Sequence, residues 1–401
     1  MEEQNRPERQ KKSRRRTNFA PIRAALVTII ACLLCIAVTA GVMCLVFFGR
    51  FGGVSNYKMA RKLAEVKEVI DENYIGDRDD TAVENAASAA MVTALGDQWS
   101  YYMTPEEYQA YLMYSANEYA GIGVTIQPES TGGGYRIVAV TAQSPAERAG
   151  LTAGDVIVSV DGTDVSDMPL SEVQQLIRSK LDRTISFSIR GADGKTRTVA
   201  VDCTVIHTDP VSFKMLDNNI GYIQINNFEK GCGDSTVKAM DQLLSDGASA
   251  LIFDVRNNPG GRLSELITVL DHVLPEGDIF VSVDRSGHET VTKSDNVCVK
   301  VPMSVLINGN TYSAAEFFAA ALKEYDWATL VGENTTGKGR SQTTLVLSDG
   351  SAVHISSNKY LTPHRVDLSE QGGLIPDIAA QPGEDPEIDS QLNAAISAVL
   401  H

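Results

Sequence analysis

A long apolar run near the start of the chain is the strongest feature of its hydrophobic pattern. Residues 24–48 are 25 consecutive uncharged, mostly apolar residues, which is enough for a helix that crosses a bilayer. Residues 1–23 carry eight Lys or Arg against three Glu. Because basic flanks stay in the cytoplasm, the pattern predicts a basic cytoplasmic tail over 1–23, a single-pass anchor in a bacterial-type plasma membrane over 24–48, and an extracytoplasmic body after Arg50.

Two other interpretations of this run were weighed. A cleaved signal peptide also begins with basic residues and an apolar core. This run, however, is longer than a usual signal-peptide core, and only a weak cleavage site of small residues follows it. Residues 29–32 weakly resemble a lipoprotein cleavage site, yet the apolar run continues for 16 residues after Cys32. We therefore favour an uncleaved anchor.

Residues 55–112 follow with a helical pattern. Residues 56–74 place apolar side chains at spacings of 4, 3 and 4, at Met59, Leu63, Val66 and Ile70, as one face of a helix does. Such a face packs within its own domain or on a second subunit, so a homo-oligomer is a possible outcome. A second helix, Ala-rich, is expected over residues 81–95.

The remaining pattern divides at about residue 203. Residues 113–203 alternate in short strands (123–126, 135–140, 156–160, 184–190 and 196–202) around helical pieces at 145–149 and 170–179. Residues 204–401 instead interleave apolar strands with helices, the arrangement of an α/β core. We expect strands at 220–225, 250–255, 305–307, 328–331, 343–347 and 352–356, and helices at 234–245, 263–274, 314–325 and 389–400.

Charge and cysteine content narrow the possible partners. The chain of 401 residues has a formal net charge of −16, and because residues 1–23 contribute +5, the remainder carries −21. An acidic body is a poor match for nucleic acid. The six histidines show no metal-binding spacing and the cysteines no disulfide framework, so the sequence predicts neither a metal nor another cofactor.

Candidate chemistry lies where residues 305–307 end and the helix at 314–325 begins. Ser313 stands at this junction, where free N–H groups and the helix dipole favour an oxyanion. Lys338 follows 25 positions later (338 − 313), between two glycines, and a strand–helix–strand unit can return it to Ser313. By themselves these residues are more often a helix cap and a solvated turn. A desolvated, neutral Lys338 could serve as the base for Ser313.

The surrounding residues resemble the carboxyl-terminal processing peptidases, also called tail-specific proteases. The resemblance is carried by Asn308 … Ser313-Ala314-Ala315-Glu316 and Gly332-Glu333 … Gly337-Lys338-Gly339 … Gln342. It implies that Ser313 is the nucleophile, that Lys338 is the base and that Gln342 supports the lysine. The family more often has small residues at the positions of Thr311 and Tyr312.

Two further motifs extend the resemblance. Residues 256–261 (RNNPGG) match the family segment that completes an oxyanion hole, which implies backbone donors at Gly260 or Gly261 and at Ala314. Gly121-Ile122-Gly123-Val124, followed by SPAERAGL and a GD…I pattern, resembles a circularly permuted PDZ domain. That resemblance implies a backbone nest for a peptide carboxylate and strand addition by the peptide. Arg178 matches a family arginine associated with switching.

Together these motifs predict an α+β multidomain protein. We expect a transmembrane helix, a helical segment, a β-rich PDZ domain and an α/β, crotonase- or ClpP-like serine-protease core. The function expected is extracytoplasmic cleavage of proteins or peptides recognised through their C-termini. The main alternative is a catalytically silent PDZ scaffold. A hydrolase that pairs Ser313 with a histidine such as His354 is less favoured, because nothing in the sequence pairs the two.

Overall fold

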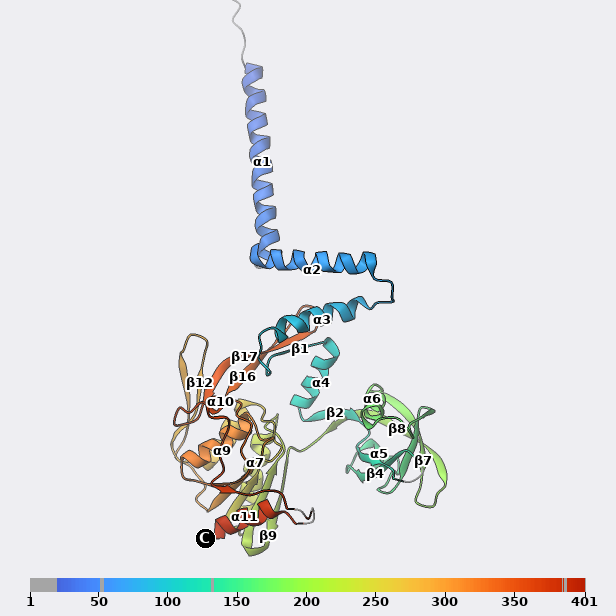
Figure 1. The fold of residues 1–401 in the computed structure, drawn as a ribbon, viewed down its shortest axis with the longest axis vertical. Coiled ribbons are helices and arrows are strands. Elements are labelled where there is room, and N and C mark those ends of the chain that lie inside the picture. Colours follow the sequence, from blue (N-terminus) through green and yellow to red (C-terminus); the bar gives the residue numbers. More distant parts are fainter. Residues whose placement is uncertain (1–19, 51–53, 131–132, 384, 386–387, 401) are drawn as a thin grey trace, which may run out of the picture. The chain divides into compact units, whose positions relative to one another are not determined.

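The computed structural model describes residues 20–50, 54–130, 133–383, 385 and 388–400 (Figure 1). Most of the predicted cytoplasmic tail, residues 1–19, lies outside them. The chain divides into two compact units, Met1–Asp80 and Thr81–His401, which are described separately.

The first unit consists of two helices. Helix α1, Ala20–Arg50, contains Ala25–Val46, an apolar span long enough to cross a membrane and wholly exposed. This confirms the long apolar helix predicted from the sequence. Helix α2, Val54–Asn73, leaves its apolar seam exposed at Met59, Leu63 and Val66.

The second unit begins with short elements that precede the PDZ domain. Helix α3 spans Asp80–Thr93, strand β1 Tyr101–Met103 and helix α4 Pro105–Ser115. Thr104 caps α4 in a capping box with Glu107. Helix α4 continues past residue 112, where the sequence pattern placed a domain boundary.

The PDZ domain is built on one seven-stranded sheet of order β2-β8-β7-β5-β4-β3, in which β6 pairs with β5. Its core holds side chains without solvent exposure, such as Ile137, Ile157 and Phe187. Strand β3 stands at one end of the sheet. The elements are β2 Glu118–Gly121, β3 Val124–Pro128, β4 Tyr135–Val140, α5 Pro145–Arg148, β5 Val156–Val160, β6 Thr163–Asp164, α6 Leu170–Arg178, β7 Arg183–Arg190 and β8 Thr196–His207.

A six-stranded sheet of order β18-β15-β14-β11-β10-β9 forms the centre of the protease-like core. All its neighbours are parallel except β9 and β10. Its elements are β9 Val211–Leu216, η1 Asp217–Asn219, β10 Ile220–Ile225, α7 Cys232–Ser245, β11 Ala250–Asp254, α8 Leu263–Val273, β14 Met303–Ile307, α9 Ala314–Glu324, β15 Thr329–Gly332, α10 Leu368–Gln371, β18 Ile378–Ala379 and α11 Ser390–Leu400.

Both faces of this sheet are covered. Phe253 and Val305 belong to the cluster that includes side chains of α7, α8 and α9, whereas Ile252 and Leu306 belong to the cluster that includes α11. Parallel strands buried on both faces read as unbroken apolar runs, and this explains why the sequence pattern located them.

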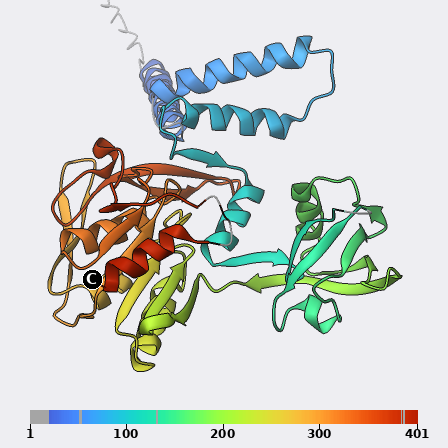
Figure 2. The same cartoon turned by 60° about the horizontal axis from the view of Figure 1, so that its bottom comes forward.

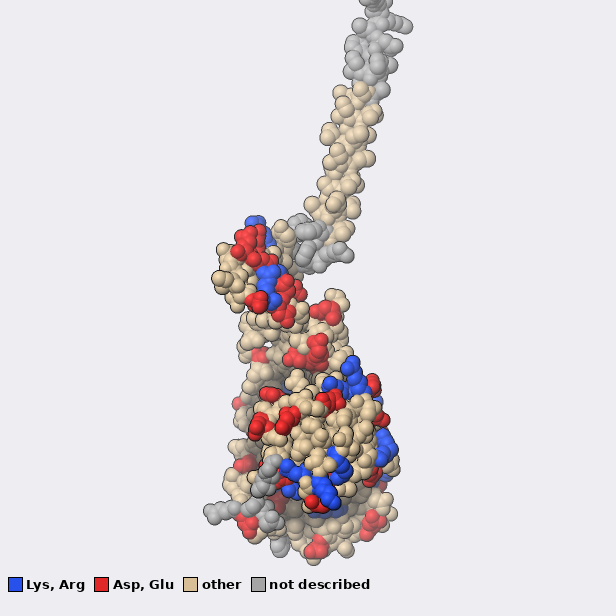
Figure 3. Space-filling model, turned by 90° about the vertical axis from the view of Figure 1, so that its right-hand side faces the viewer, with Lys and Arg blue, Asp and Glu red and all other residues tan. Residues whose placement is uncertain are grey.

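A second, antiparallel sheet has the order β1-β17-β12-β13, with β16 paired to β17 (Figure 2). Its remaining elements are β12 Gly277–Val283, β13 Glu289–Ser294, β16 Arg340–Val346 and β17 Ala352–Leu361. The hydrophobic pattern did not predict β12 and β13, and the strand predicted at 352–356 ends five residues before β17 does. Acidic and basic side chains are interspersed on the face drawn in Figure 3.

Candidate active site

Ser313 occupies a sharp turn between β14 and α9. Its φ of 59° and ψ of −129° are unusual for a residue with a side chain, and such strain costs about 1–3 kcal/mol that neighbouring contacts must offset. Buried Thr311 supplies one of them, because its hydroxyl donates to the Val255 carbonyl at 2.8 Å. The turn therefore holds Ser313 at the N-terminus of α9, as the sequence pattern predicted.

The fully buried carboxylate of Glu316 joins the serine turn to the lysine loop. It accepts hydrogen bonds from the N–H groups of Ser313 at 2.9 Å, Gly337 at 2.6 Å and Lys338 at 2.8 Å. A fourth hydrogen bond comes from the hydroxyl of Thr335. The sequence motif includes Glu316 without assigning it a role. Its spacing of three from Ser313 is that of a capping box, and this spacing is the signal that could have identified it.

The amine of Lys338 lies against two neighbouring aromatic rings. Its Nζ is 4.6 Å from the ring centroid of Trp99 and 5.8 Å from that of Tyr312. Burial lowers the pKa of Lys338 from 10.5 to about 8, while the charges of Asp97 and Glu316 oppose this shift. In the described part of the chain, no hydrogen bond joins Lys338 Nζ to Ser313.

Gln342 lies on β16 and bonds away from the lysine. Its Nε2 donates to the Ser356 hydroxyl at 3.1 Å and to the Arg340 carbonyl at 3.2 Å. Within the described residues it makes no hydrogen bond to Lys338. Its support of the lysine stays a prediction.

The loop after β11 packs directly against the serine turn. A Cβ atom on Gly260 would lie 2.8 Å from the Ala314 nitrogen and 2.8 Å from the Ser313 Cβ, so only glycine fits. The N–H of Gly260 donates to the buried side chain of Asn258 at 2.8 Å. In this arrangement the predicted oxyanion donor is therefore already occupied by a hydrogen bond. Ala314 is the first residue of α9, and its N–H has no partner within the helix. Gly261 follows directly in the same loop.

These residues line one cavity of about 700 Å³. Ser313, Lys338, Gln342, Gly260 and Gly261 all contribute to it. The rest of its wall is largely aromatic and comes mainly from β1, α4 and the second sheet, with Tyr101, Tyr108, Tyr111, Tyr114, Tyr312 and Tyr360. Such a lining fits an apolar or aromatic side chain of a ligand.

His354 also lines this cavity, although nothing in the sequence connected it with Ser313. Its Nδ1 lies 2.8 Å from the Thr344 hydroxyl, and its ring is 4.8 Å from that of Tyr101. Burial, with a contribution from the charge of Lys338, lowers the pKa of His354 to about 4. The imidazole is therefore neutral at pH 7.

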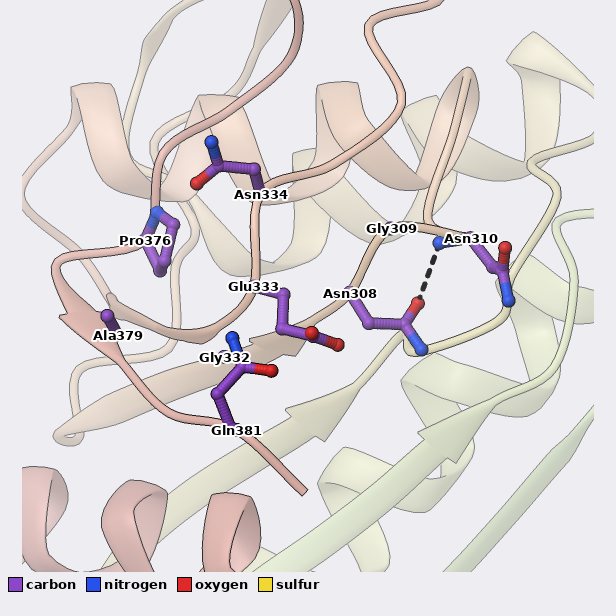
Figure 4. A pocket seen from close by; sticks show the side chains of 9 residues that line it. All are labelled: Asn308, Gly309, Asn310, Gly332, Glu333, Asn334, Pro376, Ala379 and Gln381. Atoms are coloured by element: carbon purple, nitrogen blue, oxygen red, sulfur yellow. Dashed lines mark hydrogen bonds between the residues drawn. The ribbon is translucent and has the colours of Figure 1, made fainter.

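A second pocket, of about 560 Å³, lies at the ends of β14 and β15 (Figure 4). Its lining is polar, and Asn310 N donates to Asn308 Oδ1 at 3.1 Å there. Neither Ser313 nor Lys338 contributes to it, so the candidate chemistry belongs to the aromatic cavity.

The predicted carboxylate loop lies in the PDZ domain between β2 and β3. Gly121 ends β2 and Val124 begins β3. The carbonyl of Ile122 accepts from Ala146, and that of Gly123 from Thr141, both at 2.9 Å. Gly123 has a φ of 84°, and a Cβ there would lie 2.2 Å from that of Ser144, so the turn requires glycine.

Arg178 is the last residue of α6, and its side chain is exposed. Its charge acts on Tyr119 of β2, although burial dominates and raises the pKa of that tyrosine. The arginine thus lies near the strand that leads into the carboxylate loop.

Comparison with known proteins agrees with this geometry. Residues 219–380 match the model of peptidase family S41, and residues 136–191 match that of the PDZ domain. The carboxyl-terminal-processing protease of Synechocystis sp. is 32% identical over 308 residues, which cover 75% of this chain and 71% of that protein. The chain belongs to the carboxyl-terminal processing proteases.

Other members of the family of serine peptidases are similarly related. The carboxy-terminal processing protease CtpA of Bacillus subtilis is 34% identical over 75% of this chain and 65% of its own length. A crystal structure of an S41 protease from Bacteroides fragilis superimposes with a TM-score of 0.54, covering 81% of this chain and 90% of that one. At 17% identity, it supports the fold alone.

Proposed function

We propose that this protein is a membrane-anchored serine endopeptidase that acts outside the cytoplasm on proteins or peptides recognised through their C-termini. The observation that carries the proposal is the shared cavity. Ser313, Lys338 and the Gly260–Gly261 loop line it together, and Glu316 bonds to the backbone of both predicted catalytic residues.

The proposed reaction is acyl transfer with a Ser–Lys dyad. The neutral amine of Lys338 accepts the proton of the Ser313 hydroxyl as the oxygen attacks a peptide carbonyl. It returns this proton to the leaving amine, and a water molecule then hydrolyses the acyl-enzyme by the same route. The N–H groups of Ala314 and of Gly260 or Gly261 stabilise the oxyanion, once the Gly260 N–H is released from Asn258. A pKa of about 8 leaves roughly one tenth of Lys338 neutral at pH 7.

The PDZ domain is proposed to capture the tail of the substrate. Strand β3 stands at the end of its sheet, so one edge of β3 is open to an added strand. The turn at Gly121–Val124 precedes this edge, where a terminal carboxylate would be bound. A hydrogen bond to a charged group contributes about 1.5–3 kcal/mol. Amidation of the tail should therefore weaken its use by roughly 10- to 100-fold.

Helix α1 is proposed as an uncleaved anchor with the N-terminus in the cytoplasm. Support comes from the apolar span Ala25–Val46 and the basic residues that precede it. Protease added to spheroplasts should then digest the body after Arg50. Digestion from outside of residues 1–20 alone, with the body protected, would reverse the orientation.

The decisive experiment compares extracytoplasmic protein C-termini in cells with the wild-type chain and with Ser313→Ala. An endopeptidase predicts new C-termini that depend on Ser313. The resting arrangement, in which Lys338 makes no hydrogen bond to Ser313 and Asn258 engages Gly260, favours a second candidate, a silent scaffold that binds tails. Identical C-termini, together with no reaction of Ser313 with a phosphonylating probe, would support the scaffold.

A further inference from the structure

The seat of the Lys338 amine against two aromatic rings is not explained by its role as a base. Its Nζ lies over the face of Trp99, and the rings of Trp99 and Tyr312 are themselves 5.7 Å apart. An aromatic face within about 6 Å attracts a cation, and tryptophan does so most strongly. It offers no such attraction to a neutral amine. This aromatic seat is therefore complementary to the ammonium form, which is the form that cannot accept a proton.

The turn that carries Trp99 is held by hydrogen bonds on two sides. The backbone N–H of Trp99 donates to Asp97 Oδ1 at 3.2 Å, and the hydroxyl of Ser100 donates to Asp97 Oδ2. The same hydroxyl accepts from Ser356 N of β17 at 3.0 Å. The turn that carries Trp99 is thus fastened to the sheet beside the active site, and the ring of Trp99 packs against that of Tyr312.

The charged groups around Lys338 can be assigned. Asp97 is ionised, because hydrogen bonds including that of Ser100 outweigh burial and lower its pKa. Glu316 faces the lysine from α9, with its oxygens engaged by N–H donors, and both carboxylates favour the ammonium. His354 faces it from β17 and is neutral at pH 7. Burial of the lysine opposes the carboxylates.

We propose that Trp99 is a positioning residue that keeps Lys338 in a resting seat as an ammonium, and that loss of the proton to solvent frees the amine to reach Ser313. The inference rests on the proposed function for its catalytic consequence, but the seat itself is a property of the lysine and the ring. Loss of the proton then makes the Lys338 amine competent as a base and also releases it from the ring of Trp99, so that both changes occur in one event. Tyr312, where the family more often has a small residue, packs beside Trp99 and adds a second ring 5.8 Å from the amine.

The seat can be tested without any enzymatic activity. The chain has two tryptophans, and the second, Trp327, lies partly buried with its Nε1 donating to the Val299 carbonyl. In a Trp327→Phe background, Trp99 is the sole source of indole fluorescence. A charge 4.6 Å from this ring should alter its emission, with a titration midpoint near the Lys338 pKa of about 8.

Lys338→Met in the same background is the matched control, since it keeps a long apolar chain and removes the charge. The transition near pH 8 should disappear in it. Asp97 and His354 titrate well below this region, and burial raises the pKa of Tyr312 above 10. Persistence of the transition in Lys338→Met would refute the proposed seat of the lysine. Absence of any such transition in the Trp327→Phe protein would refute it as well.

The catalytic part is tested by the pH dependence of Ser313 acylation by a phosphonylating probe. A cation–π contact of about 0.5–2 kcal/mol corresponds to about 0.4–1.5 pH units at 1.36 kcal/mol per unit. Trp99→Leu should move the acylation profile to lower pH by this amount. Trp99→Phe should move it by less, because it keeps an aromatic ring, and it serves as a control for misfolding. A reduced plateau with an unmoved midpoint in both variants would refute the positioning role. Absence of acylation in every variant, with the fluorescence transition intact, would refute the endopeptidase and leave the seat standing.

Discussion

Replacement of Gly260 by alanine measures how closely the loop after β11 meets the serine turn. Gly260 has a φ of 87°, and an added Cβ would lie 2.8 Å from the Ala314 nitrogen, 2.8 Å from the Ser313 Cβ and 2.9 Å from the Tyr312 carbonyl oxygen. Two of these are backbone atoms of the turn, so the strain cannot be relieved by rotation of a flexible side chain.

The chain provides a matched control. Gly231, at the start of α7, also has a φ of 87°, but a Cβ there would meet nothing within 4 Å. The left-handed conformation costs an alanine about 1–2 kcal/mol at either position. Overpacking adds about 1–3 kcal/mol at Gly260 only. The difference between Gly260→Ala and Gly231→Ala therefore isolates the contact with the serine turn.

Denaturant unfolding should show that Gly260→Ala loses about 1–3 kcal/mol more stability than Gly231→Ala. If the loop instead shifts by about 1 Å to accommodate the Cβ, the stability is kept and the reaction rate at Ser313 falls, because a displacement of that size can cost about 100-fold in rate. Acylation of Ser313 by the phosphonylating probe should thus slow in Gly260→Ala and remain normal in Gly231→Ala. Equal stability and equal acylation in the two variants would show that the close approach does not exist.

Further outcomes are expected from the same assays. Lys338→Arg should abolish turnover as completely as Ser313→Ala, because guanidinium stays protonated; appreciable residual activity would argue against the dyad. Turnover should rise with pH and level off above about 8, since the neutral fraction of the Lys338 amine grows through its lowered pKa and becomes dominant above it; a flat profile across this pH would exclude this base. Glu316→Gln should lower the free energy of unfolding by about 1.5–3 kcal/mol through the loss of charged hydrogen bonds, and calorimetry without such a drop would show that the carboxylate does not join the two loops. A non-cleavable tail peptide added in trans should stimulate cleavage of a short substrate if binding to the PDZ domain favours an active arrangement, whereas a domain that only tethers substrate predicts no change or inhibition.

The parts of this molecule that the sequence predicted are those governed by local pattern. Strands such as 250–254 and 303–307 are mostly apolar runs because both faces of their sheet are covered. Ser313 was singled out because the motif around it resembles that of a known family, since its place at a strand–helix junction alone is typical of a helix cap. The motif around Gly260 was found through the same resemblance, although the engagement of the Gly260 N–H by Asn258 depends on how the loop folds back.

The unpredicted features depend on contacts between distant segments. The ring of Trp99 contacts the amine of Lys338 because the hydroxyl of Ser100 bonds to β17, 256 residues further on. Nothing in either local sequence predicts that contact. The same pairing brings His354 opposite Tyr101 and so into the cavity. Strand β13 was missed because its exposed positions make it less apolar than the central strands, whereas β12 contains a short buried run, Ile279 to Val281, that the sequence pattern left unassigned.

The pairing of β1 with β17 also has a consequence for the time at which the cavity first exists during biosynthesis. Ser100 and its partner Ser356 are separated by 256 residues, which a ribosome adds in roughly 10–50 s at about 5–20 residues per second. During this interval the turn that carries Trp99 and the tyrosines of β1 and α4 have no sheet to close against. A nascent chain therefore carries the serine turn before it has an enclosed site, and the order of synthesis itself delays the appearance of proteolytic capacity until the second sheet is complete.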